Sequence, residues 1–327
     1  MHRWVRGKRA RRFAGLAAAL ILFAASSAHA YPDRPVRIVV PFAPGGLNDV
    51  TARLVQPHLE KALGQPVIVD NRPGASGALG TDVVAKAAPD GHTLVMVASS
   101  HTVLPATHAK LPYDAERDLA PVAMVGRNPL LFVINAKVPA QSLTEFVALA
   151  KAEPGKFNYA SPGAATQTHL VAELFAQAAG VKLQYIPYRG GAPTIMTLVQ
   201  GEAHFTVISP LVSMPQISAG ALRALAAGSL ARDPQLPNLP TVAEQGFPGF
   251  EAIQWVGLLT TAGTPRTIID RLNAEVNKAL REPDVIDKLA KQGIAPAGGS
   301  ADDFQRTIVS EIGRWMAIAR AANIKAE

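Results

Sequence analysis

The feature that most constrains this chain is the alternation of short apolar runs with longer segments of helical periodicity. Several of the apolar runs are continuous rather than alternating, as in strands of sheets that helices cover on both faces. Strands and helices that alternate along the whole chain predict an α/β fold. The predicted strands are Val36–Pro41, Val67–Asn71, Thr93–Ala98, Val122–Val125, Leu130–Asn135, Asn158–Ala160, Leu183–Pro187, Ala203–Ile208, Ala221–Ala226 and Ile253–Leu259.

Helices are predicted between these strands from apolar spacing and from capping residues. Ser142 is a suitable N-cap, and Thr264 followed by Pro265 resembles a cap with proline at the first helical position. Pro57 lies inside the helix that starts near Asn48, where we expect a kink or a short break. The apolar faces are Leu143, Phe146, Val147 and Ala150; Ile269, Leu272, Val276 and Leu280; and Phe304, Ile308, Ile312, Trp315 and Ala319.

The first thirty residues have the order of a secretory signal peptide. A basic start is followed by the uncharged run Ala14–Ala25 and by the small-residue ending Ser26–Ala30, which predicts cleavage after Ala30. A membrane anchor is the alternative, but the apolar run is about a dozen residues and a span needs about 20. Arg11-Arg12-Phe13 loosely matches a twin-arginine signal, so the export route stays open. We expect an exported, periplasmic protein.

Charge and cysteine content exclude several classes of function. The chain of 327 residues has a formal net charge of +7, and the six charged residues of the leader are all basic, which leaves +1 for the rest. The high isoelectric point therefore gives no support for binding to nucleic acid or membranes. The chain has no cysteine, which excludes disulfides, thiolate metal sites, a catalytic cysteine and a lipid-modified cysteine.

Three turns rich in glycine and small residues follow predicted strands and lead into predicted helices. They are Pro44–Asp49, Asn71–Gly80 and Ser161–His169. A helix N-terminus has unpaired N–H groups and the positive end of the helix dipole, so these turns suit a carboxylate or phosphate. Each can equally be an ordinary strand-to-helix connection. None matches a Walker loop or a dinucleotide-binding motif.

The sequence gives little support for an enzyme. His169 and Glu173 share a helical face at i, i+4, but a metal site needs a further ligand that nothing nearby supplies. Ser161 lacks the Gly-x-Ser-x-Gly surroundings of a nucleophile elbow, so a pairing with His169 is a weak hypothesis. His101, His108 and His204 are isolated in the sequence, and Tyr188–Gly191 is either a cleft edge or another connection. We expect no catalytic residue, metal or cofactor.

The motifs of the chain resemble one family along nearly its whole length. PFAPGGLNDVTARLV, LGQPVIVDNRPGASGALG, PDGHTLVMVASS, LPYDAERDLAPVAMV, FNYASPGAATQTHLVAELF and YIPYRGGAPTIMTLVQGEAHF are similar to the Bug-type extracytoplasmic solute receptors, the binding proteins of tripartite tricarboxylate transporters. The resemblance implies a periplasmic-binding-protein fold, with two α/β lobes and a ligand cleft between them. It places residues 31–133 and 254–327 in the first lobe and residues 134–253 in the second.

The resemblance also implies a ligand and the residues that hold it. Family members bind small organic acids and deliver them to a membrane permease, and main-chain amides of the first two loops hold a carboxylate. A monomer without cofactor is expected. The residues implied are Phe42, Gly45, Gly46, Leu47, Asn48, Asp49, Ala75, Ser76 and Gly77, opposed by Ser161, Thr166, His169, Tyr188 and Gly190.

Three residues depart from the family's usual pattern. Leu47, Ala78 and Ala165 stand where small, polar or glycine residues are common. Backbone amides do not depend on side-chain identity, so we expect the carboxylate contacts to persist. Leu47 and Ala165 make the site less polar and favour a monocarboxylate or a less charged acid over citrate. A sensor that signals to a membrane histidine kinase and an exported enzyme on the same fold remain alternatives.

Overall fold

The computed structural model describes residues 31–108, 110–163, 166–188 and 190–321. The predicted leader and Ala165 lie outside these residues. The chain divides into a short segment, Met1–Asp33, and a compact body, Arg34–Glu327. Of the short segment, the described residues Tyr31–Asp33 are irregular and contain a cis Tyr31–Pro32 bond.

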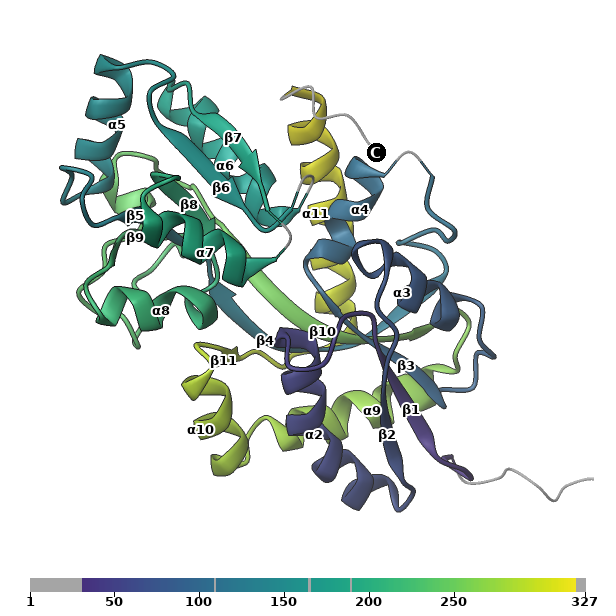
Figure 1. Cartoon of the computed structure of the whole chain (residues 1–327). Coiled ribbons are helices and arrows are strands. Elements are labelled where there is room, and N and C mark those ends of the chain that lie inside the picture. The colour runs from purple at the N-terminus through teal and green to yellow at the C-terminus, as the bar shows by residue number, and fades with distance from the viewer. Residues whose placement is uncertain (1–30, 109, 164–165, 189, 322–327) are drawn as a thin grey trace, which may run out of the picture. The chain divides into compact units, whose positions relative to one another are not determined.

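The body contains two sheets, and the first has six strands in the order β11-β4-β10-β3-β1-β2 (Figure 1). Strand β1 pairs in parallel with both β2 and β3, while β10 pairs antiparallel with β3 and β4. The loops that follow β1, β2 and β3 therefore leave from the same edge of the sheet. The strands are β1 Val36–Val40, β2 Val67–Asn71, β3 Thr93–Ala98, β4 Leu119–Pro129, β10 Ile253–Thr261 and β11 Ala295–Pro296.

The second sheet has five strands in the order β7-β6-β8-β5-β9. Strand β6 is parallel to β7 and β8, and β5 is antiparallel to β8 and β9. The loops after β6 and β7 therefore also share one edge. The strands are β5 Leu131–Asn135, β6 Asn158–Ser161, β7 Gln184–Pro187, β8 Phe205–Ile208 and β9 Leu222–Ala227.

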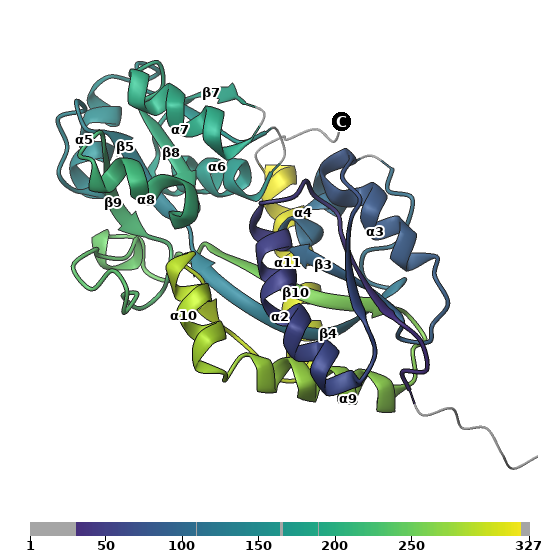
Figure 2. The ribbon, with the colours of Figure 1, turned by 60° about the horizontal axis from the view of Figure 1, so that its bottom comes forward.

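Helices pack on both sheets, and we call each sheet with its helices a lobe. In the first lobe α2 lies beside α9 (Figure 2), and side chains of α3, α4 and α11 share a core cluster on β1, β3 and β10. The first-lobe helices are α2 Leu47–Leu63, α3 Ala78–Ala85, α4 Ser100–Thr107, α9 Arg266–Ala279, α10 Pro283–Lys291 and α11 Ala301–Ala321, with the 3₁₀ turn Ala75–Gly77. The second-lobe helices are α5 Leu143–Ala152, α6 Gln167–Ala179, α7 Gly191–Gln200 and α8 Pro210–Ser218, with the 3₁₀ turn Ala243–Gln245.

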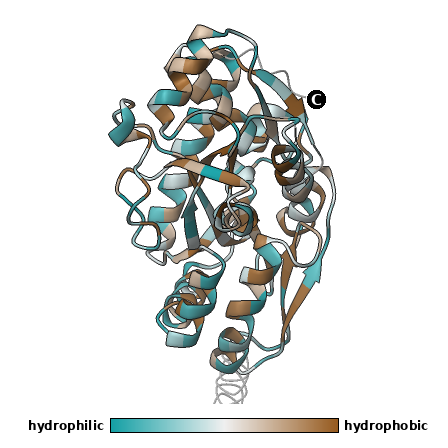
Figure 3. Cartoon of the chain, turned by 60° about the vertical axis from the view of Figure 1, so that its left-hand side comes forward, coloured by the Kyte–Doolittle hydropathy of each residue, from teal (hydrophilic) through white to brown (hydrophobic). Residues whose placement is uncertain are grey.

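An aromatic cluster forms the core of the second lobe. The rings of Phe146 and Phe205 stack at 5.0 Å, and Phe132 meets Phe175 edge-on at 5.2 Å. Burying each such side chain stabilises the fold by about 1.5–3 kcal/mol. Hydrophobic and hydrophilic residues alternate around the helices (Figure 3), as expected for amphipathic helices with one face toward a core.

The predicted α/β class with two sheets is confirmed, and many elements match their predicted bounds. Ser142 caps α5 by accepting a hydrogen bond from the Glu145 N–H. Along α11 the predicted residues Phe304, Ile308, Ile312, Trp315 and Ala319 are all buried. The sheets change between Pro129 and Leu131 and again between Ala227 and Ile253. The predicted division at residues 133 and 254 stays a prediction, and its first boundary falls within β5.

Two local predictions were wrong, and a third was wrong in part. Helix α2 runs from Leu47 to Leu63 through Pro57, so the expected short break is absent, while a kink at Pro57 stays a prediction. Pro265, not Thr264, is the N-cap of α9, since the Thr264 hydroxyl donates to the Thr261 carbonyl instead. Strand β4 extends seven residues beyond the predicted Val122–Val125, three before it and four after, because it pairs with β10 through Pro121, Pro129 and Gly126.

No helix among the described residues is long and apolar enough to cross a membrane.

Candidate functional site

The topology brings the four predicted segments together in two pairs. The loops after β1 and β2 leave one edge of the first sheet, and those after β6 and β7 leave one edge of the second. In α/β sheets, ligands bind beyond the carboxyl ends of parallel strands. Both predicted halves of the site therefore have the topology expected of binding loops.

The first loop presents the start of α2 without a side-chain cap. Gly46 is the N-cap residue in extended conformation, and among the described residues no side chain caps the helix there. The first hydrogen bond of the helix runs from Val50 N–H to the Gly46 carbonyl, so the amides of Leu47, Asn48 and Asp49 come before it. Gly45 and Gly46 are exposed, which leaves the end of the helix accessible.

The side chain of Asp49 stabilises this loop from inside. Its carboxylate accepts hydrogen bonds from Gly45 N–H at 2.9 Å, Arg53 Nε at 3.0 Å and Asn71 Nδ2 at 3.0 Å. Burial raises the pKa of Asp49, but the bonds from Arg53, Gly45 and Asn71 outweigh it and hold the pKa below its usual value. Asp49 is thus a buried anion whose charge Arg53 balances, and its side chain is not available to a ligand.

Two amide side chains complete the support of the first loop. Asn48 is 5% exposed and donates from Nδ2 to the Met96 carbonyl at 2.7 Å. Asn71 also donates to the Phe42 carbonyl at 3.1 Å, which ties the loop to the end of β2. Among the predicted residues of this loop, Asn48 and Asp49 therefore offer only their main-chain amides, while Leu47 and Phe42 are half-buried.

The second loop has a run of four residues with positive φ. Gly74, Ala75, Ser76 and Gly77 have φ values of 142°, 45°, 54° and 96°. Residues other than glycine rarely adopt this region, and such strain concentrates at functional sites. A Cβ atom added to Gly77 would lie 3.0 Å from Cζ of Phe42, so the first and second loops are in contact at that glycine. Ala75 and Ser76 are exposed.

Ala78, one of the departures from the family pattern, lies in the core. It is 3% exposed and belongs to the hydrophobic cluster beneath β1 and β3. Its identity therefore matters for packing and not for the surface that a ligand would meet.

The third loop differs from the first because its helix is capped. Thr166 is the N-cap of α6, and its hydroxyl accepts the His169 N–H at 3.3 Å and donates to the Gly163 carbonyl at 2.9 Å. Ser161 is 1% exposed, and its hydroxyl donates to the same Gly163 carbonyl at 2.7 Å. The hydroxyls of Ser161 and Thr166 thus hold the loop in shape.

His169 belongs to an aromatic stack. Its ring lies on Tyr185 at 4.0 Å and 10°, and Tyr185 stacks on Tyr159 at 5.1 Å. The Tyr159 hydroxyl donates to Glu173, whose carboxylate lies 3.9 Å from His169 Nε2. Burial lowers the pKa of His169 to about 4, so the ring is neutral at pH 7. His169 forms part of a packed wall of the second lobe.

The fourth segment is anchored to the third. Tyr188 N–H donates to the Ser161 carbonyl at 3.0 Å, and Gly190 N–H donates to the Pro162 carbonyl at 2.8 Å. The Tyr188 hydroxyl is bonded to Thr197 at 2.6 Å and is therefore directed toward α7. Gly190 has φ 111° and is the N-cap of α7, again without a side-chain cap. Arg189 lies outside the described residues.

The geometry of the described residues gives no support for a metal site or a nucleophilic serine. Within the part of the chain that the structure describes, no group of three or more His, Cys, Asp or Glu residues could hold a metal ion. The Ser161 hydroxyl is engaged with Gly163 and lies 3.2 Å from the Tyr185 hydroxyl, the geometry of a structural serine.

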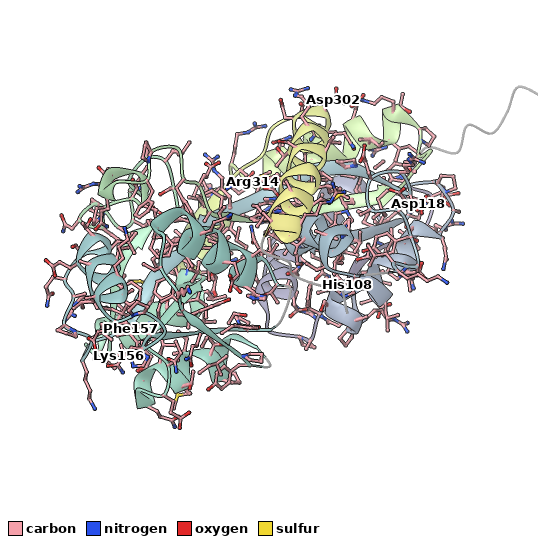
Figure 4. The ribbon with its side chains drawn as sticks, turned by 90° about the horizontal axis from the view of Figure 1, so that it is seen from above. His108, Asp118, Lys156, Phe157, Asp302 and Arg314 are labelled. Carbon is pink, nitrogen blue, oxygen red and sulfur yellow. The ribbon has the colours of Figure 1, made fainter. Side chains whose placement is uncertain are left out.

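Pockets that the described residues form elsewhere on the body include five that are lined by other residues. Two have volumes of about 580 Å³: one includes His108 and Asp118, the other Arg314 (Figure 4). A smaller pocket of about 280 Å³ includes Lys156 and Phe157. The remaining two, of about 310 and 530 Å³, both include Met214. The candidate site therefore rests on loop geometry and not on a cavity.

Residues that sequence reasoning missed connect the loops to their surroundings. Asn71 holds the first two loops together, and the side chain of Gln167 reaches Ser99 of the first lobe. The sequence showed Asn71 only as a polar residue at the end of a predicted strand. No local pattern predicted the role of Gln167, because its partner Ser99 is 68 residues away.

Comparison with known proteins agrees with this architecture. The family model described as "Tripartite tricarboxylate transporter family receptor" matches residues 51–324. Protein BugT of Bordetella pertussis is 39% identical over 301 residues, covering 91% of this chain and 92% of BugT. The solved structure of R. palustris Rpa4515 with adipate has 34% sequence identity and a TM-score of 0.81, and the match covers 91% of this chain and 100% of Rpa4515. The structure of MatC from Rhodopseudomonas palustris with bound malate has 32% identity and a TM-score of 0.76, and the match covers 88% of this chain and 99% of MatC. The chain belongs to the tripartite tricarboxylate transporter receptors, a family of solute-binding proteins.

Proposed function

We propose that this protein is a periplasmic receptor that captures a small organic acid by its carboxylate and delivers it to a tripartite tricarboxylate-type permease. Two similar solved structures contain adipate and malate, both small dicarboxylates, which supports an organic acid as the ligand. The leader predicted from the first thirty residues supports export.

The observation that carries the proposal is the uncapped start of α2. The amides of Leu47, Asn48 and Asp49 precede the first hydrogen bond of the helix, and no side chain in the described part of the chain caps them. Several amides together with the helix dipole can balance one negative charge without an arginine. Arg53 is paired with Asp49, so the carboxylate of the ligand would meet backbone donors.

The second loop would complete this carboxylate site. Its backbone twists through four residues of positive φ next to Phe42 of the first loop. Consecutive N–H groups in such conformations form concave anion-binding turns. Ala75 and Ser76 would then add amides to those of α2, whereas the Gly77 N–H already donates to the Gly74 carbonyl at 2.9 Å.

Binding would involve no chemistry. An organic acid enters between the lobes, and loop amides replace its hydration shell with charge-assisted hydrogen bonds. The second lobe then closes by a hinge motion, with Ser161, Thr166, His169 and the turn at Tyr188 and Gly190 as the opposing wall. The closed monomer docks on the permease.

The nature of the first loop also suggests which acid is preferred. Leu47 is half-buried at the start of α2, where it would place an apolar side chain next to the carboxylate. We therefore expect monocarboxylates or less charged acids to bind more tightly than citrate.

Isothermal titration with acetate, benzoate, adipate, malate and citrate tests the proposal. We expect at least one of the first four to bind, more tightly than citrate and with little dependence on salt, because closure of the second lobe would enclose the site. Failure of every carboxylate to bind would contradict the receptor proposal. Tight binding of citrate without binding of the monocarboxylates would contradict the role of Leu47.

A further inference from the structure

Gln167 connects the two lobes through a buried amide. It is the first residue of α6 and is 3% exposed, although glutamine is mostly found at surfaces. Its Nε2 donates to the Ile253 carbonyl at 2.8 Å, and its Oε1 accepts from Ser99 Oγ at 2.5 Å. Both partners belong to strands or strand ends of the first lobe, so the two polar ends of this side chain are satisfied across the lobes. We call this pair of hydrogen bonds the Gln167 bridge.

The first-lobe end of the Gln167 bridge is held rigidly. Ser99 N–H donates to the Trp255 carbonyl at 2.9 Å, and Thr102 Oγ1 donates to the Ser99 carbonyl at 2.8 Å. Trp255 Nε1 donates to Oε2 of Glu311 on α11 at 2.9 Å, and Thr102 Oγ1 lies 2.8 Å from the same oxygen. Three elements, β10, α4 and α11, therefore fix the position of Ser99.

The bridge lies beside the place where the chain crosses between the lobes. There Leu130 N–H donates to the Ala252 carbonyl at 2.9 Å, and Gly228 N–H donates to the Leu130 carbonyl at 2.8 Å. Ile253, one partner of Gln167, follows Ala252 directly. A contact next to a hinge moves little when the lobes rotate, so the bridge can persist in open and closed states.

We propose that Gln167 is a positioning residue for ligand binding. The Gln167 bridge fixes the angle between the two lobes. It thereby holds the start of α6, with Thr166 and the third loop, at a fixed position relative to the first-lobe loops. This rests on the proposed function. Because both polar ends of the side chain are occupied, Gln167 acts through lobe geometry and not by touching the ligand.

The competing explanation is a buried amide that only stabilises the fold. Asn135 provides a matched control, because it is 4% exposed and its amide is bonded entirely within the second lobe. Its Nδ2 donates to the Leu198 carbonyl at 2.5 Å, and its Oδ1 accepts the Lys137 N–H at 2.8 Å. Asn135→Ala removes a buried amide of comparable environment without affecting a bond between the lobes.

The first experiment measures the distance between the lobes without ligand. Because the chain has no cysteine, Lys61→Cys on α2 and Lys151→Cys on α5 give two unique labelling sites, one in the last turn of each helix. Pulsed electron spin resonance then gives the distance distribution. We expect Gln167→Ala to broaden or shift it and Asn135→Ala to leave it unchanged. An unchanged distribution in Gln167→Ala, or an equal change in both variants, would overturn the proposal.

The second experiment measures affinity for adipate and malate. Both acids would need the lobes in the same orientation, so Gln167→Ala should weaken the binding of both by the same factor, about tenfold. Unequal factors would show direct ligand contact and overturn the proposal. Should Gln167→Ala not fold, Ser99→Ala removes one of the two bonds and should act in the same direction in both experiments. If neither acid binds the unmodified protein, the same comparison is made with a carboxylate of the titration panel that does bind. Failure of the whole panel contradicts the proposed function, while the distance measurement still decides the role of Gln167.

Discussion

The loops that begin α2 and α6 occupy corresponding places in the two lobes, but among the described residues a side chain caps the first amides of α6 and not those of α2. At α6 the Thr166 hydroxyl accepts the His169 N–H, and Ser161 and Thr166 both donate to Gly163. At α2 the N-cap is Gly46, which has no side chain to offer. The polar side chain of the first turn, Asp49, turns back to Gly45 and Arg53.

The difference indicates that the two loops have different roles. An anion stabilises a capped helix start only a little, whereas an uncapped start still has unpaired N–H donors that an anion can accept from. We infer that the first lobe holds the carboxylate and that the second supplies the wall that closes over it. The uncapped start of α7 at Gly190 is the second-lobe feature that could add donors.

Acid should affect the two lobes alike, and this is the largest effect we expect. Burial lowers the pKa of His101 in the first lobe and of His169 in the second to about 4, from 6.5. The unfolded chain therefore takes up these protons first, and stability present above pH 6.5 is lost as the pH falls toward 4. Each histidine should contribute a slope of about 1.4 kcal/mol per pH unit. Chemical denaturation at a series of pH values measures this slope.

His101→Gln and His169→Gln should each reduce the acid slope by about 1.4 kcal/mol per pH unit. A variant that keeps the full slope would show that the pKa of the replaced histidine is not lowered in the folded state, contrary to the account.

Placing a carboxylate at the start of α2 should abolish ligand binding. Gly46 has φ −80° and ψ 172°, which any residue can adopt, and an added Cβ would lie 3.6 Å from the Ala43 carbonyl oxygen. In Gly46→Asp the new side chain caps the helix and repels the ligand, so affinity should fall by roughly 100-fold or more while the melting temperature holds or rises. Calorimetric titration and thermal unfolding measure the two effects.

Thr166→Asp is the matched control for this variant, since it puts the same charge on a helix start that is already capped. It should weaken binding by less than about tenfold. Equal losses in both variants would remove the proposed difference between the lobes.

Removing the existing cap of α6 should lower stability and leave ligand affinity nearly unchanged. Thr166→Ala deletes the hydroxyl that accepts the His169 N–H, which should cost about 1 kcal/mol of stability. Affinity should change by less than about threefold, because the third loop forms a wall and not the carboxylate contact. Urea denaturation and titration give both numbers; a large loss of affinity with unchanged stability would favour a direct contact by Thr166.

The smallest effect should come from the strained second loop. Ser76 has φ 54°, which glycine adopts at lower cost, while glycine also loses more entropy on folding. Ser76→Gly should therefore change stability by less than about 1 kcal/mol and weaken the ligand a few-fold, because the loop is less preorganised. A clear loss of stability would mean that the Ser76 side chain supports the fold.

The sequence predicted the elements well where local signals were strong. Strands β2 and β3 have the predicted ends, and the buried face of α11 was identified residue by residue. Strand β4 was underestimated because Pro121, Gly126 and Pro129 interrupt its apolar run, and only its pairing with β10 shows that it continues.

The location of the site stays a prediction, and the hydrogen bonds that support its loops could not be predicted. Gly45, Gly46 and the Ala75–Gly77 turn followed from their positions after strands and from the family resemblance. The bonds of Asp49 to Asn71 and of Gln167 to Ser99 join residues 22 and 68 positions apart. No local pattern encodes such contacts, because they exist only once the sheets have formed.

The central claim is that backbone amides at the start of α2 hold the ligand's carboxylate, and amide NMR spectra recorded with and without adipate test it most directly. Formation of charge-assisted hydrogen bonds should move the amide proton signals of Leu47, Asn48 and Asp49 strongly downfield. The amide of His169, already bonded to Thr166, should move little. Large shifts at His169 together with unchanged signals at the start of α2 would contradict the account.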